Sequence, residues 1–225
     1  DLVPGSAAWF SALTQILIAA GATGGHERVE RWAGVARDTP ASVEEGSSAK
    51  SVCLSSAALM LVFGGRYALA DALLEGAESA IEGAAAPDLD AVANLHEARA
   101  IRAHASGDPG ASLVGIEAAL AAFERAGDVR RACLARMNLG YSYGQAGQLE
   151  EAEAALRQAL AESERMELRG TTAYVLQNLG LVLAYRGRLD EARAVEETAC
   201  EMLERHGDAR MEGCARIYLA SILVL

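Results

Sequence analysis

The sequence predicts an all-α protein, a right-handed α-solenoid of antiparallel helix pairs with about five and a half repeats. Three observations predict this fold class. The composition favours the helix formers Ala, Leu, Glu and Arg, and only 5% of the residues are aromatic. A glycine turn recurs about every 40 residues. Apolar residues follow each turn at helical spacing, so each helix has one face to bury against a neighbour.

The turn glycines divide the chain into repeats. Gly65, Gly107, Gly147 and Gly187 are 42, 40 and 40 residues apart, and Gly24 or Gly25 stands 41 or 40 residues before Gly65. The phrases "ERAGD" at 124–128 and "ERHGD" at 204–208 lie 80 residues apart and confirm the period. Taken in order, the repeats are expected at about 6–46, 47–88, 89–129, 130–169 and 170–209, followed by a lone helix at 210–225.

Each repeat is expected to hold a first helix, A, and a second helix, B. In the clearest copy helix A runs from about Arg130 to Gln145 and helix B from about Leu149 to Arg165. Gly140 and Gly180 stand inside the A helices, where glycine costs about 1 kcal/mol. We therefore expect them to be points where two helices approach closely. Because the lone helix has no second helix, residues 1–225 are expected to form a single solenoid domain that belongs to a longer chain.

The pattern of small and apolar residues resembles the tetratricopeptide repeat over essentially the whole chain. The best copy carries Leu139, Gly140, Tyr143, Gly147, Leu149, Ala152, Leu156 and Ala159. The next copy matches at Leu179, Gly180, Leu183, Gly187, Leu189, Ala192 and Ala199. It departs from the family pattern at Glu196, where the pattern has an apolar residue. The 40-residue period resembles kinesin light chains and the C-terminal repeat regions of bacterial multidomain signalling proteins, which carry a serine/threonine kinase or a signal-transducing ATPase.

Charge and cysteine usage exclude several functions. The formal net charge of −11 opposes binding to nucleic acid or to anionic membranes. Cys53, Cys133, Cys200 and Cys214 lack any CxxC spacing, so we expect buried free thiols, no metal site and a cytoplasmic protein. The apolar stretch "ALTQILIAAGA" is too short to span a bilayer, so no membrane insertion is expected.

The motifs of catalysis are also missing from the sequence. "GATGGHERVER" superficially suggests a phosphate-binding loop, but it lacks the Lys-Ser/Thr pair and no strand precedes it. His96 and His104 are eight residues apart, which is not the spacing of a zinc-binding HExxH helix. We therefore expect no catalytic residue, no metal and no cofactor in this segment, and any kinase or ATPase domain would lie elsewhere in a longer chain.

The resemblance implies that the A helices line a concave groove that binds peptides. The residues expected in the groove are Asn94, Glu97, Ile101 and His104 in one copy, Leu134, Met137, Asn138, Tyr141 and Gln145 in the next, and Tyr174, Gln177, Asn178, Leu181 and Tyr185 in the third. In related arrays, asparagines in the slot of Asn138 and Asn178 form a ladder on the peptide backbone, although this Asn can also serve local packing. The lysine clamp for carboxylate tails is absent, so an acidic tail is not the expected ligand.

These features predict a non-catalytic module that binds a protein or peptide, as a regulatory or sensor region of a larger bacterial signalling protein. The alternative is a structural scaffold that self-associates and leaves the groove empty. A homodimer through the C-terminal helix 211–225 belongs to that alternative, because Ile217, Leu219 and Leu223 would otherwise be left uncovered.

Overall fold

The computed structural model describes residues 2–42, 44–82, 88–207 and 209–224, without the side chains of residues 44, 45, 206 and 210. The described residues form eleven helices and no strand, which confirms the all-α prediction. The helices are α1 (Ala7–Ala22), α2 (His26–Asp38), α3 (Glu44–Phe63), α4 (Tyr67–Ile81), α5 (Leu89–Ala105), α6 (Pro109–Ala126), α7 (Val129–Gln145), α8 (Leu149–Arg165), α9 (Arg169–Tyr185), α10 (Leu189–His206) and α11 (Ala209–Leu223).

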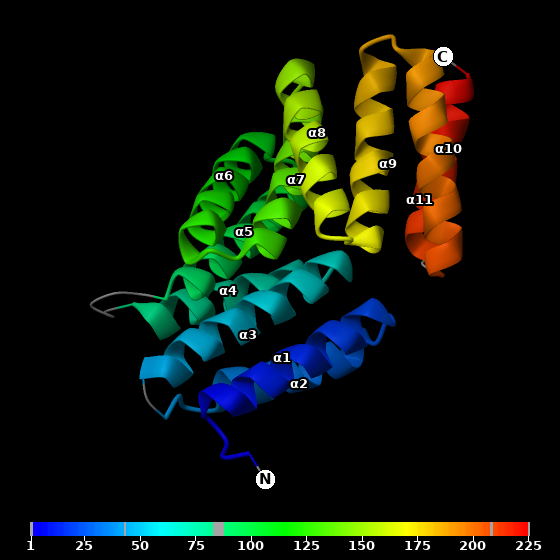
Figure 1. The fold of residues 1–225 in the computed structure, drawn as a ribbon. Coiled ribbons are helices and arrows are strands. Elements are labelled where there is room, and N and C mark those ends of the chain that lie inside the picture. Colours follow the sequence, from blue (N-terminus) through cyan, green and yellow to red (C-terminus); the bar gives the residue numbers. More distant parts are fainter. Residues whose placement is uncertain (1, 43, 83–87, 208, 225) are drawn as a thin grey trace. The chain divides into compact units, whose positions relative to one another are not determined.

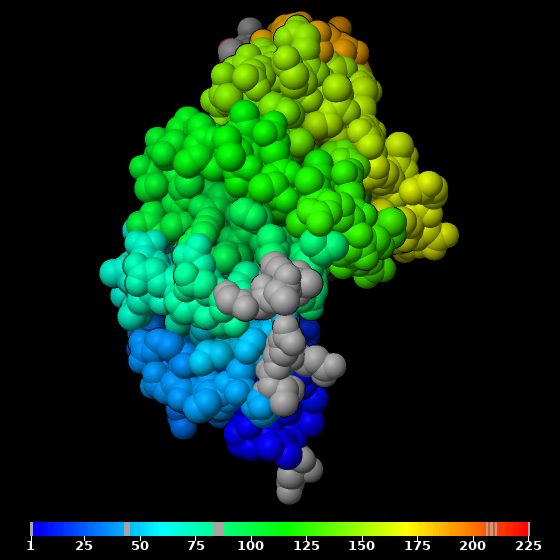
Figure 2. All heavy atoms as spheres, turned by 90° about the vertical axis from the view of Figure 1, so that its left-hand side faces the viewer, coloured from blue at the N-terminus to red at the C-terminus, as the bar shows by residue number. Residues whose placement is uncertain are grey.

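The chain folds into two compact units, Asp1–Gly127 with α1–α6 and Asp128–Leu225 with α7–α11. Within each unit, helices that are neighbours in sequence pack against each other in antiparallel pairs (Figure 1). In the first unit the helices follow one another in chain order, from blue through cyan to green (Figure 2). A single continuous domain over residues 1–225 stays a prediction.

Glycines in the left-handed backbone conformation make the turns inside the pairs. Gly24, Gly65, Gly107, Gly147 and Gly187 all have φ between 71° and 79°, as the 40-residue period predicts. Gly24, rather than Gly25, takes this conformation in the first pair. Between pairs, Gly127 and Gly207 cap α6 and α10 in the same way. The corresponding position after α8 holds Glu167, with φ 55°, which costs a non-glycine residue about 1–2 kcal/mol.

Each unit has its own apolar core. In the first unit α3 packs against α1, α4 and α5, and Leu54 and Leu61 on α3 are buried with Phe10 and Leu17 on α1. One stretch of α3, Gly46–Phe63, has the length and hydropathy of a membrane span, but 56% of it is buried inside the unit. A helix in the core of a globular unit has the same composition.

In the second unit, small residues let paired helices approach closely. Ala152 and Ala192 are completely buried, and a Cβ atom added to Gly140 would lie 2.6 Å from Cγ of Leu156 on α8. The helix pair α7–α8 therefore needs glycine at this position, which accounts for the cost of a glycine inside a helix. The predicted bounds of this pair are confirmed to within one residue.

Candidate functional site

The second unit places its three A helices next to one another, because α9 packs against both α7 and α11. One stripe of each helix stays partly open to solvent. On α9 the half-buried Tyr174, Asn178 and Leu181 alternate with buried residues, and Tyr185 at the helix end is 56% exposed. The stripe on α7 holds Leu134, Asn138, Tyr141 and Gln145, and the stripe on α11 holds Cys214 and Tyr218. We call these stripes of α7, α9 and α11 the A-helix face. It is the surface on which a groove was expected.

Most of the predicted groove residues of the second unit lie on this face. Leu134, Asn138, Tyr141, Tyr174, Asn178 and Leu181 are half-buried, and Gln145 and Tyr185 are exposed. Met137 and Gln177 are instead buried, with 9% and 2% of their surface exposed, and Met137 belongs to the core of the unit. These two residues contribute packing and are not part of the surface open to a ligand.

The groove residues predicted on α5 belong to the first unit. Glu97 and Ile101 are half-buried and His104 is exposed. Asn94 is buried, and its Nδ2 donates a hydrogen bond of 2.7 Å to the backbone oxygen of Asp90 within the same helix. Asn94 therefore serves its own helix, which is the local role that an asparagine can take in place of peptide binding.

Three tyrosines of the second unit interact electrostatically. Tyr141 of α7 interacts electrostatically with Tyr185 of α9, and Tyr218 of α11 interacts with both. Burial raises the pKa of Tyr218 to about 12, and the neighbouring Tyr141 adds to this shift. Burial also raises the pKa of Tyr141, and the interaction with Tyr185 adds to this shift. Tyr218 is absent from the predicted site, although it stands 40 residues after Asn178 and the period itself could have found it.

A buried carboxyl group lies between α9 and α10. Glu196 on α10 is completely buried, and neither carboxyl oxygen has a hydrogen-bond partner among the described residues. A Cβ atom added to Gly180 would lie 2.3 Å from Oε2 of Glu196, so the side chain fills the space over this glycine of α9. Burial raises the pKa of Glu196 to about 9, and the Glu196 carboxyl group contributes to the raised pKa of Tyr218.

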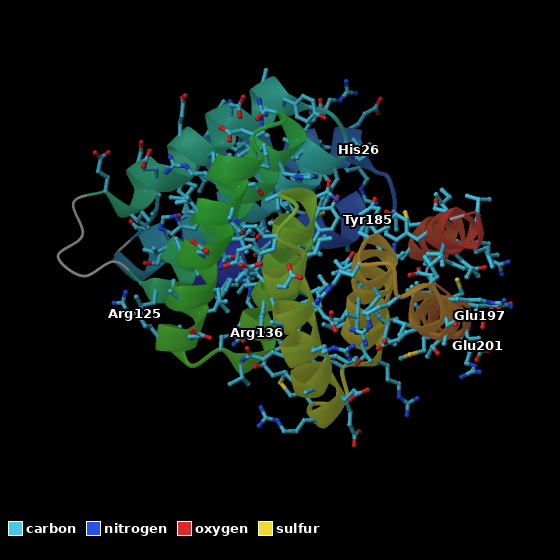
Figure 3. All side chains as sticks on the ribbon, turned by 90° about the horizontal axis from the view of Figure 1, so that it is seen from above. His26, Arg125, Arg136, Tyr185, Glu197 and Glu201 are labelled. Carbon is cyan, nitrogen blue, oxygen red and sulfur yellow. The ribbon has the colours of Figure 1, made fainter. Side chains whose placement is uncertain are left out.

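Ion pairs concentrate on the B helices of the second unit. Glu153 on α8 is 7% exposed and accepts hydrogen bonds from Arg157 at 2.7 Å, from Arg188 at 2.8 Å and from Arg186. Burial opposes ionisation, but the arginines outweigh it and lower the pKa of Glu153. On α10, Glu197 and Glu201 extend from the side that faces away from α9 (Figure 3). The named residues of the A-helix face, by contrast, carry no charge.

The first unit offers a shallow pocket of about 420 Å³ lined by Arg37, Lys50, Leu54 and Gly76, among others. Its cations already have partners. Lys50 Nζ donates hydrogen bonds of 2.9 Å to the backbone oxygens of Arg37 and Thr39, and Arg37 pairs with Asp38. In the described part of the chain, no group of three or more His, Cys, Asp or Glu side chains could hold a metal ion.

All four cysteines are free thiols. Cys53 and Cys133 are buried, as expected from their apolar surroundings, and burial raises the pKa of Cys53 to about 11. The expectation of burial is wrong for Cys200 and Cys214, which are only half-buried on α10 and α11. The reason is that α11 is the last helix of the unit and has no helix on its far side among those described.

A family model described as tetratricopeptide repeat matches residues 130–205. The structure is similar to a signal transduction ATPase with numerous domains (STAND) that has a tetratricopeptide repeat sensor, from Pyrococcus horikoshii. The TM-score is 0.74 and the identity 15%, and the match covers 95% of this chain and 32% of that one. The nearly identical kinesin light chain repeats of Podosopora anserina align with a TM-score of 0.63 and 15% identity, over 90% of this chain and 98% of theirs.

Aspartyl phosphate phosphatase F from Bacillus subtilis is also similar, with a TM-score of 0.64 and 12% identity over 89% of this chain and 48% of that one. This chain therefore spans about a third of the STAND protein and about half of the phosphatase. The comparison with curated proteins gives no match. At these identities the likeness establishes the fold, that of a helical repeat solenoid.

Proposed function

We propose that this chain is a non-catalytic module that binds an extended peptide on its A-helix face. A tetratricopeptide repeat model matches residues 130–205, and the fold is similar to that of such arrays. The observation that carries the proposal is the pair Asn138 and Asn178. They stand 40 residues apart on the adjacent helices α7 and α9, and both are partly open to solvent. A side-chain amide both donates and accepts hydrogen bonds, which suits the backbone of an extended peptide.

We further propose that the module is a regulatory or sensor region of a larger bacterial signalling protein in the cytoplasm, associated with a serine/threonine kinase or an ATPase. The STAND protein supports this proposal, since it has a tetratricopeptide repeat sensor and its match covers 95% of this chain. The uncharged A-helix face, next to ion-paired B helices, also favours recognition of a peptide over binding of nucleic acid.

Selection from a library of random 12-residue peptides, with the purified chain as bait, tests the proposal. Replacing Asn138 and Asn178 together by alanine should weaken binding of the selected peptides by about 5- to 100-fold, since each hydrogen bond contributes about 0.5–1.5 kcal/mol. Isothermal titration calorimetry measures the loss. Replacing the exposed Gln158 of α8 by alanine is the control and should leave the affinity unchanged. Equal affinities for the wild type and the double variant would show that the two asparagines do not bind the peptide.

The second candidate is self-association through α11. Ile217 and Leu223 on this helix are 64% and 58% exposed, and Val224 directly after it is 85% exposed, whereas Ile222 is buried in the core of the unit. Exposed apolar side chains on a terminal helix favour contact with a second copy. Sedimentation velocity at micromolar concentration distinguishes the two candidates. A dimer that dissociates when Ile217 and Leu223 are changed to Glu would favour the scaffold, and a monomer would exclude it.

A further inference from the structure

We propose that the second unit binds a free α-amino acid with an apolar side chain, in a pocket where the turn between α8 and α9 meets the second half of α10. We call this pocket the turn pocket. Its volume of about 480 Å³ lies in the range of about 300–1,000 Å³ that is usual for small-molecule sites. None of its lining residues belongs to the A-helix face, so this inference goes beyond the proposed function.

Three segments of the second unit build the turn pocket. α9 packs against both α8 and α10 (Figure 1). The lining residues are Glu164 at the end of α8, Glu167 in the turn, Arg169, Thr172 and Leu176 on the first half of α9, and Thr198 and Met202 on α10. The charged residues therefore come from the turn and the helix ends beside it, and the apolar residues come from the helices.

The charged residues of the turn pocket have opposite signs but do not pair with one another. Glu164, Glu167 and Arg169 are exposed, and in the described part of the chain no ion pair joins Arg169 to either glutamate. Elsewhere in the unit, Arg157 and Arg188 do pair with the glutamates around them. The turn pocket thus offers two carboxylates and a separate guanidinium group. A ligand that carries both an ammonium group and a carboxylate matches them, and a free amino acid is the simplest such molecule.

The uncharged residues suit the other parts of an amino acid. The hydroxyl groups of Thr172 and Thr198 donate their protons within the protein, at 3.0 or 3.1 Å and at 2.9 Å. Their oxygens are left as hydrogen-bond acceptors, which suits an ammonium group. Leu176 and Met202 offer apolar surface to the side chain of the ligand, and the flexible methionine can adapt to its shape.

The backbone at Glu167 supports a role for its side chain in binding. Glu167 has φ 55°, whereas the corresponding turns after α6 and α10 hold Gly127 and Gly207, with φ 74° and 77°. Glycine adopts this conformation without the steric cost that any other residue has there. Strained residues of this kind are typical of functional sites, and this one lines a pocket.

The test follows three leucine compounds on the full 225-residue chain by NMR, with methionine methyl groups labelled with ¹³C and the Met202 signal assigned through Met202→Leu. The compounds are L-leucine, N-acetyl-leucine, which lacks the ammonium group, and leucinamide, which lacks the carboxylate. L-leucine should shift the Met202 signal and bind about 10-fold more tightly than either analogue, because each analogue loses its charged partner on one side of the pocket. Glycine should also bind about 10-fold more weakly, because it buries no side chain.

Two variants test the charged residues. Arg169→Gln should remove the preference for leucine over leucinamide. The control is Arg165→Gln, at an exposed arginine beside the same turn that does not line the pocket, and it should leave the preference intact. Glu167→Gly should raise the midpoint of thermal unfolding and at the same time weaken the binding of leucine about 5-fold.

The inference is wrong if the Met202 signal does not move, if the three leucine compounds bind alike, or if Glu167→Gly binds leucine as tightly as the wild type. Peptide binding on the A-helix face involves none of these residues, so the proposed function stands if only leucine fails to bind. A chain that binds leucine but no peptide would keep this inference and lose the proposed function.

Discussion

Replacing Glu196 by leucine is expected to raise the free energy of unfolding at pH 8 by about 2–4 kcal/mol. The buried carboxyl group has no hydrogen-bond partner among the described residues, and folding at this pH also requires it to take up a proton. Leucine should fit, because Leu156 occupies the corresponding position of α8 and packs over Gly140 as Glu196 packs over Gly180. Urea denaturation measures the change.

The matched control is Glu197→Leu at the next position of α10. Glu197 is exposed and pairs with Arg193 one turn away, so its replacement should change the stability by no more than about 0.5 kcal/mol. Equal effects of the two leucine variants would show that Glu196 is not buried as described.

The pH dependence gives an independent check on Glu196. Its pKa is raised from 4.5 to about 9 on folding, so the folded state holds more protons than the unfolded state between these values. The contribution of this group to stability is therefore greatest below about pH 4.5. It falls as the pH rises towards 9, by at most about 1.4 kcal/mol for each pH unit. Glu196→Gln should remove this decline, and an unchanged pH profile would contradict the assignment.

Gly140→Ala is expected to lower the free energy of unfolding by about 1–3 kcal/mol. The new Cβ would lie 2.6 Å from Cγ of Leu156 and 3.2 Å from the backbone oxygen of Ala152, so the two helices would have to separate. The same substitution at Gly213 of α11 meets no atom within 4 Å and should raise the stability by about 0.5–1 kcal/mol, because alanine favours a helix. Thermal unfolding followed by circular dichroism compares the two variants. A change of the same sign in both would contradict the packing of α7 on α8.

The turns could be predicted from sequence because each requires a backbone conformation that glycine alone adopts easily. A residue type and a fixed period were therefore enough to place Gly65, Gly107, Gly147 and Gly187, all of which have positive φ. The helix bounds followed from the same turns. The exception, Glu167, shows that a turn can keep its shape without glycine where the packing of both flanking helices holds it.

The surface of the candidate site was harder to predict, because burial depends on neighbours that a single repeat does not contain. Met137 and Gln177 occupy slots expected to face a ligand but are buried. Glu196 stood out in the sequence only as a departure from the repeat pattern. Its carboxyl oxygens have no hydrogen-bond partner among the described residues, and the group interacts electrostatically with Tyr218. Both properties depend on how α10 packs with α9 and α11, which no sequence motif encodes. The three arginines around Glu153 likewise come from two different repeats.

The most direct test of the central claim is a map of where a selected peptide contacts the chain. Backbone amide signals assigned by NMR should shift on peptide binding at Asn138 and Tyr141 of α7 and at Asn178 and Tyr185 of α9. The exposed residues of α8 and α10, such as Gln158 and Glu201, should keep their signals unchanged. Shifts confined to α8 and α10, or to the exposed residues Ile217 and Leu223 of α11, would contradict a peptide site on the A-helix face.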